Sequence, residues 1–119
     1  MTKSSQELLQ IVIAAADDKL AQEIVALDVR NLTPMADYFV IAHARNEKQM
    51  EAIVDEIEKV VEENGYTVKS IEGKDSGRWI LVDLTDVIVH IFYYSERGFY
   101  NLEKLWSDAP IVNVASEAK

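Results

Sequence analysis

The sequence predicts a mixed α/β domain, with a five-stranded sheet and helices packed on it in the order α-β-β-α-β-β-β-α. Three observations predict this fold class. Two long segments have apolar residues at helical spacing, runs of β-branched and aromatic residues lie between and after them, and residues 78–92 have the pattern of a hairpin. Helical crossovers combined with a hairpin imply a sheet with both parallel and antiparallel neighbours.

The chain opens with a predicted helix, which two strands follow. Ser4 and Glu7 have the spacing of a capping box, and apolar residues then recur at helical periods. Residues 24–29 are predicted as the first strand. The next segment contains Pro34, which prevents regular pairing, so we expect a loop there. Residues 38–44 are almost continuously apolar, which is typical of a strand in the middle of a covered sheet.

A second helix begins after Asn46, which is a good N-cap, and Gln49 has the position of the reciprocal cap. Its apolar residues form one stripe, and its opposite face is mostly acidic. Gly65 has the position of a left-handed C-cap residue. Residues 67–71 alternate as a short strand does, and residues 72–77 contain two glycines and form a turn.

The hairpin pattern is the most informative feature of the chain, because Thr85-Asp86 reads as a tight turn between two β-rich runs. The expected pairs are Leu84 with Val87, Val82 with Val89 and Ile80 with Ile91. One face of the hairpin is then purely aliphatic. The other face carries Trp79, Leu81, Asp83, Ile88, His90 and Phe92. We interpret the aliphatic face as core and the mixed face as a candidate for a partner.

More than one structure fits the C-terminal part of the chain. Either Ser95 or Asn101 can cap a short last helix, which runs through Trp106 and ends at Asp108-Ala109-Pro110. Residues 111–114 fit a short edge strand or a loop.

Length, composition and charge limit which kinds of protein the chain can be. The chain has 119 residues, no cysteine and a formal net charge of −9. We expect one domain at residues 1–114 and a flexible tail at residues 115–119. No apolar run is long enough for a membrane span, and no targeting segment is evident, so we expect a cytoplasmic protein. The acidity disfavours direct nucleic-acid binding and favours a basic protein partner, although it could serve solubility alone.

No catalytic constellation is evident. His43 and His90 have no partner at metal-ligand spacing, and the serines fit turns and helix starts. The loop at residues 73–77 has the wrong spacing for a phosphate-binding loop. Asp83 and Asp86 could suggest a metal site, but acidic residues are common in tight turns. We therefore predict no catalytic residue, no metal and no cofactor.

Aromatic and charged residues are dense toward the C-terminus. Trp79, Arg97 and Tyr100 are of the residue types that dominate binding hot spots. The same side chains could equally complete the core of a small domain, and physical reasoning alone gives the surface role and the core role about equal weight.

An ordered set of motifs resembles a known family. The motifs are Ala36-Asp37-Tyr38-Phe39-Val40-Ile41-Ala42, Asp86-Val87-Ile88-Val89-His90-Ile91-Phe92, Phe99-Tyr100, Leu102-Glu103, Leu105-Trp106 and Asp108-Ala109-Pro110. Together they resemble the Iojap family, the ribosomal silencing factors, over residues 5–112. Ala36 and His43-Ala44 stand where the family usually has serine and Thr-Gly.

The resemblance implies a non-enzymatic role and a nucleotidyltransferase-like topology. It implies binding to the fourteenth protein of the large ribosomal subunit at the intersubunit face, which blocks joining of the small subunit and represses translation. We predict that the partner-binding residues are Trp79, Leu81, Asp83, His90, Arg97, Tyr100 and Glu103. A homodimer of the free protein is a secondary hypothesis. The alternative function is a nucleotidyltransferase-like, nucleotide-binding enzyme.

Overall fold

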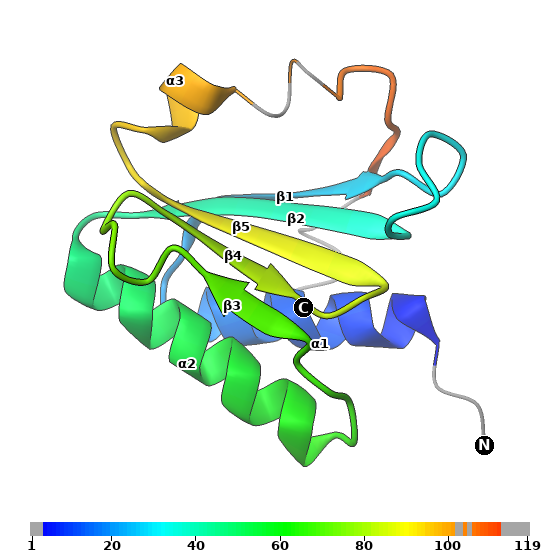
Figure 1. The fold of residues 1–119 in the computed structure, drawn as a ribbon, viewed down its shortest axis with the longest axis horizontal. Coiled ribbons are helices and arrows are strands. Elements are labelled where there is room, and N and C mark those ends of the chain that lie inside the picture. Colours follow the sequence, from blue (N-terminus) through cyan, green and yellow to red (C-terminus); the bar gives the residue numbers. More distant parts are fainter. Residues whose placement is uncertain (1–3, 102–103, 105, 113–119) are drawn as a thin grey trace.

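The computed structural model describes residues 4–101, 104 and 106–112, apart from the side chains of residues 99 and 100 (Figure 1). Its elements are α1 (Ser5–Asp18), β1 (Gln22–Asp28), β2 (Tyr38–Ala44), α2 (Glu47–Glu63), β3 (Ser70–Glu72), β4 (Trp79–Asp83), β5 (Val87–Tyr93), α3 (Arg97–Tyr100) and β6 (Ile111–Val112). The predicted mixed α/β class is confirmed. Within the described residues, no helix has the length and apolar character that crossing a membrane requires.

The sheet has the strand order β3-β4-β5-β2-β1-β6. The central pair, β2 and β5, is parallel, and the other neighbours are antiparallel. The prediction of five strands is wrong by one, because β6 pairs with β1 through Leu27 and Ile111. Its two residues are too few for an alternating pattern, so the sequence left this segment as an edge strand or a loop.

Both long helices cover one face of the sheet, and α3 lies over the other (Figure 1). The apolar stripes of α1 and α2 contain fully buried residues such as Val12 and Ile53. The predicted aliphatic face of the hairpin meets them, and Ile80, Val82 and Val89 are buried there. This burial of aliphatic surface is the main stabilising contribution to the fold.

Polar side chains set the helix starts as the sequence predicts. The Ser4 hydroxyl accepts a hydrogen bond from the Glu7 backbone N–H at 3.1 Å, and the Asn46 side chain accepts one from Gln49 at 2.8 Å. The Gln49 side chain accepts from the Arg45 backbone N–H and donates to the carbonyls of Lys19 and Leu20. It therefore ties the start of α2 to the end of α1.

The hairpin has the predicted register. Ile80 faces Ile91 and Val82 faces Val89, and the Leu84 backbone N–H donates to the Val87 carbonyl at 3.0 Å. The loop is Thr85-Asp86, and Thr85 has a φ of 75°. A left-handed residue in this position gives the turn the twist that two antiparallel strands require.

The boundaries of other elements differ from the prediction. The first strand lies at Gln22–Asp28 instead of residues 24–29, and the third at Ser70–Glu72 instead of 67–71. The helix α3 spans Arg97–Tyr100, because Asn101 takes a left-handed conformation (φ 46°, ψ 56°) and ends it, and Lys104 is helical again further along the chain.

Trp106, which we expected in that helix, lies in a turn. The predictions for Leu102, Glu103, Leu105 and the tail at residues 115–119 concern positions outside the described residues.

Candidate partner-binding site

The sheet face opposite α1 and α2, which we call the distal face, carries the aromatic residues of the hairpin. Strand register places Trp79 beside Phe92, Leu81 beside His90 and Asp83 beside Ile88. The same rows continue across β5 into β2, where His90 faces Ile41 and Phe92 faces His43. The distal face is therefore mixed aromatic and polar, as the alternation predicts.

Part of this face is a second, smaller core. Phe39, Ile41 and Phe92 are buried in it together with Ala109 from the segment before β6. The Phe39 ring meets the Trp106 ring edge to face at 5.0 Å between centroids. The chain thus covers the β1 and β2 side of the distal face with its own C-terminal segment.

Strand β4 presents the more accessible part of the distal face. Trp79, Leu81 and Asp83, which we call the β4 strip, are all half-buried. Asp83 also has a structural role, since its carboxylate accepts a hydrogen bond from the Thr85 backbone N–H at 2.8 Å. An apolar ring, an aliphatic side chain and a carboxylate therefore lie in one line at the surface.

His90 lies behind the β4 strip and is only 6% exposed. Its Nδ1 atom accepts a hydrogen bond from the Trp79 indole Nε1–H at 3.2 Å. Burial lowers the pKa of the imidazole to about 4, so the ring is neutral near pH 7. Because its Nδ1 accepts, the proton is on Nε2, for which the described residues provide no hydrogen-bond partner. His90 therefore does not present a polar surface of its own.

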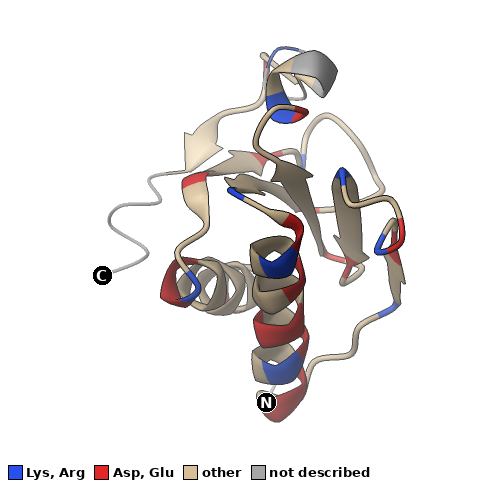
Figure 2. Ribbon diagram, turned by 90° about the vertical axis from the view of Figure 1, so that its left-hand side faces the viewer, with Lys and Arg blue, Asp and Glu red and all other residues tan. Residues whose placement is uncertain are grey.

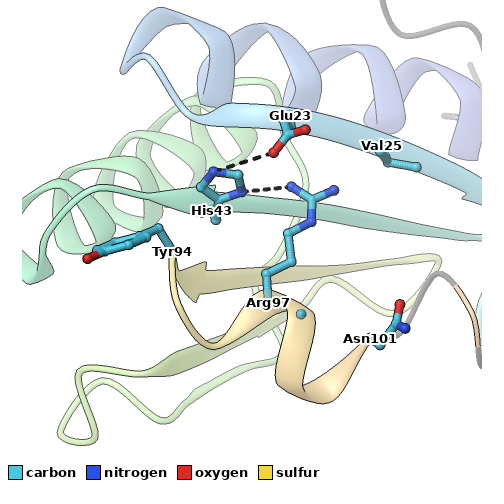
Figure 3. Close-up of a pocket in the computed structure, with 7 residues that line it drawn as sticks. Glu23, Val25, His43, Tyr94, Arg97 and Asn101 are labelled. Carbon is cyan, nitrogen blue, oxygen red and sulfur yellow. Dashed lines mark hydrogen bonds and ion pairs between the residues drawn. The ribbon is translucent and has the colours of Figure 1, made fainter.

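Arg97 is also buried, with 9% exposure, although we predicted it as a contact residue. Figure 3 shows its side chain reaching from α3 toward His43 on β2. Arg97 Nη1 lies 2.9 Å from His43 Nδ1 and donates to the Gln22 carbonyl at 3.3 Å. A guanidinium can only donate, so His43 Nδ1 is the acceptor in this pair.

These groups line an open cavity of about 530 Å³. The lining residues are Glu23, Val25, His43, Tyr94, Arg97, Gly98 and Asn101. The Glu23 carboxylate lies 3.7 Å from His43 Nε2, on the other side of the imidazole from Arg97 (Figure 3). Sequence reasoning missed this arrangement, because His43 and Arg97 are 54 positions apart in the sequence and no spacing signal connects them.

The structure thus groups only some of the predicted residues. Trp79, Leu81 and Asp83 form the β4 strip, and His90 supports it from below. Arg97 is at the same end of the sheet as Trp79, since Gln22, His43, Phe92 and Trp79 form one row across four strands. Tyr100 belongs to α3, but its side chain is outside the described part, and so is Glu103.

The acidic residues are concentrated elsewhere. Figure 2 shows them along α2, in the helix layer on the far side of the sheet from α3. A shallow surface there is lined by Asp55, Glu58, Lys59, Glu62 and Glu63. Across the described ranges, no group of three or more histidine, aspartate or glutamate side chains has the geometry to hold a metal ion.

Fold and site together define a small acidic α/β domain with one aliphatic and one aromatic sheet face. The family model "Ribosomal silencing factor during starvation" matches residues 2–119, nearly the whole chain. The chain belongs to this family of ribosomal silencing factors, as its motifs indicated.

Individual relatives agree. The chain is 50% identical to the ribosomal silencing factor RsfS of Halalkalibacterium halodurans over 111 residues, which cover 93% of this chain and 95% of the relative. It is 50% identical to RsfS of Bacillus subtilis, with 93% and 94% covered. It is 36% identical to the chloroplastic protein Iojap of Zea mays, with 80% of this chain and 41% of that protein covered.

Solved structures have the same fold. A crystal structure from Bacillus halodurans has a TM-score of 0.81 and 47% identity, and the alignment covers 91% of this chain and 98% of that one. A crystal structure from Chromobacterium violaceum has a TM-score of 0.86 and 30% identity, with 88% of each chain covered.

Proposed function

We propose that this chain represses translation in the cytoplasm without catalysing a reaction. It binds the fourteenth protein of the large ribosomal subunit at the intersubunit face and sterically blocks joining of the small subunit. Family membership supports the ribosomal role. The observation that carries the binding site is the β4 strip, where a partly exposed tryptophan lies beside a leucine and an aspartate.

The β4 strip has the chemistry of a binding hot spot. The indole of Trp79 already uses its N–H within the chain, so a partner meets its ring surface and gains apolar contact. Tryptophan is among the residues whose loss weakens interfaces most, typically by about 2 kcal/mol or more. Asp83 at the end of the strip adds a negative charge suited to a basic partner.

The net charge supports the same partner class. A formal charge of −9 attracts a basic ribosomal protein at long range and is repelled by ribosomal RNA phosphates. The α2 carboxylates lie on the far side of the sheet from α3 (Figure 2), so they add to the net charge of the domain but lie outside the contact that the β4 strip makes. A homodimer of the free protein through the same strip is a secondary proposal.

The test is cosedimentation with isolated large subunits. Trp79→Ala should weaken binding about 30-fold or more, because the interface loses its central ring. Met35→Ala is the matched control, since Met35 is 73% exposed in the loop before β2 and outside the β4 strip. Trp79 stacks on Phe92, so circular dichroism must first show that the variant is folded at the assay temperature.

A second variant separates charge from structure. Asp83→Asn keeps an oxygen that can accept from Thr85 but removes the negative charge. We expect it to weaken binding at low salt and to matter less as ionic strength rises. Unchanged binding by folded Trp79→Ala would exclude the β4 strip as the interface. Failure of the unmodified protein to cosediment would refute the proposed function itself.

A further inference from the structure

We propose that His90 is a positioning residue for partner binding: its imidazole holds the Trp79 indole in the orientation that the partner recognises. This inference rests on the proposed function, since it assumes that Trp79 contacts the partner. It assigns His90 an indirect role, in place of the direct contact predicted from the sequence.

The first argument is geometric. The Trp79 ring is stacked on Phe92, with centroids 5.1 Å apart and planes inclined by 30°. Stacking fixes the ring plane but tolerates rotation of the ring within it. The hydrogen bond from Nε1 to His90 Nδ1, at 3.2 Å, fixes the remaining direction. The two contacts together select one orientation of the indole.

The backbone of Trp79 is also held. Its N–H donates to the Ser76 hydroxyl at 3.4 Å. Gly73 lies so close that an added Cβ would overlap the Trp79 carbonyl oxygen, and its φ of +88° also favours glycine. The backbone is thus fixed from this side, and the ring stacking and the indole hydrogen bond act on the side-chain torsions of Trp79.

The second argument is the energetic disadvantage of a histidine here. The neutral imidazole leaves a buried Nε2–H without a partner among the described residues, and such an orphaned donor is destabilising. A phenylalanine would fill the same space among Phe39, Phe92 and Trp79 without an orphaned Nε2–H, but it would remove the acceptor of the Trp79 indole N–H. The acceptor at Nδ1 is the one group that His90 supplies and phenylalanine does not.

An oriented ring has a functional advantage. A surface tryptophan that must be immobilised on binding loses side-chain entropy at that step, and a ring already fixed in the free protein does not. His90 therefore contributes to affinity through the free state, without touching the partner.

The first measurement uses the isolated protein. Proton NMR resolves the indole N–H signals, and the variant Trp106→Phe identifies the signal of Trp79. His90→Phe should shift the Trp79 indole proton and speed its exchange with solvent, while the thermal midpoint stays equal or rises. His90→Asn, which places an oxygen near the position of Nδ1, should restore protection. An unaltered indole signal in His90→Phe would overturn the proposed hydrogen bond.

The second measurement is a double-mutant cycle in large-subunit binding. His90→Phe alone should weaken binding about three- to tenfold, the range of one ordinary hydrogen bond. In a Trp79→Phe background, which already lacks the indole donor, His90→Phe should have no further effect. An additive loss would show that His90 acts independently of Trp79 and would overturn the inference.

The outcomes separate this inference from the proposed function. If Trp79→Ala weakens binding and His90→Phe does not, the positioning role is wrong and the proposed function stands. If the NMR result holds but Trp79→Ala leaves binding unchanged, the proposed binding surface is wrong, and the positioning role falls with it.

Discussion

A single buried imidazole makes the stability of this domain dependent on pH. The pKa of His90 is lowered to about 4 by burial, whereas an exposed histidine in the unfolded chain titrates near 6.5. Between these values the unfolded chain binds a proton that the folded chain does not. The free energy of unfolding therefore decreases as the pH falls from about 6.5 to about 4.

Replacing this residue should remove that part of the pH dependence. Between pH 7 and pH 4.5 we expect the free energy of unfolding to fall by on the order of 2 kcal/mol more in the unmodified protein than in His90→Phe. The reason is that pH 4.5 lies about two units below the pKa of a histidine in the unfolded chain, but still above the lowered pKa of folded His90. Urea unfolding at both pH values measures the difference. All other ionisable groups are common to the two proteins, so their contributions cancel in the comparison. An equal loss in both would contradict the lowered pKa.

At the scale of single elements, Gln49 connects two helices. Its amide accepts from Arg45 and donates to two carbonyls at the end of α1, so one side chain serves two helix ends. Gln49→Ala should destabilise the fold by about 1–2 kcal/mol. Asn46→Ala, which removes one capping bond only, should cost about 1 kcal/mol. Thermal or urea unfolding of both variants tests this order, and a smaller effect for Gln49→Ala would contradict it.

The elements that the sequence predicts well are those with local determinants. The caps at Ser4 and Asn46 depend on residues three positions away, and the hairpin register depends on its two-residue loop. The placement of α3 was not predicted and strand β6 was predicted only as one of two alternatives, because each depends on distant contacts. Arg97 bonds to Gln22 across 75 positions, and β6 forms only where β1 offers an edge.

The same distinction applies to the candidate site. Alternation along the hairpin correctly places Trp79, Leu81, Asp83 and His90 on one face. It cannot show which of them neighbouring strands and the C-terminal segment cover. His90 is interior because Trp79 and Phe39 enclose it, and that enclosure follows from strand order.

At the scale of the whole molecule, the alternative function is that of a nucleotidyltransferase-like enzyme that binds a nucleotide. The nucleotidyltransferase-like topology stays a prediction, and similarity of fold would not transfer activity. A ligand that binds only the folded state must raise the melting temperature. Because we predict no nucleotide binding, we expect ATP or GTP with Mg²⁺ to leave the melting temperature unchanged. Differential scanning fluorimetry measures this. A rise of several degrees with either nucleotide would favour the enzyme, and magnesium alone is the control.

The parallel pairing of β2 with β5 sets the order in which a growing polypeptide can fold. Tyr38 of β2 lies opposite Val87 of β5, so the central pair of the sheet cannot form before β5 has been synthesised. Both α1 and α2 precede β5 in the chain, and they can shield one side of β2 while it waits. The neighbours on the other side, Phe92 and Trp106, come later in the chain than both helices, so a growing chain acquires its aromatic surface after its helix layer.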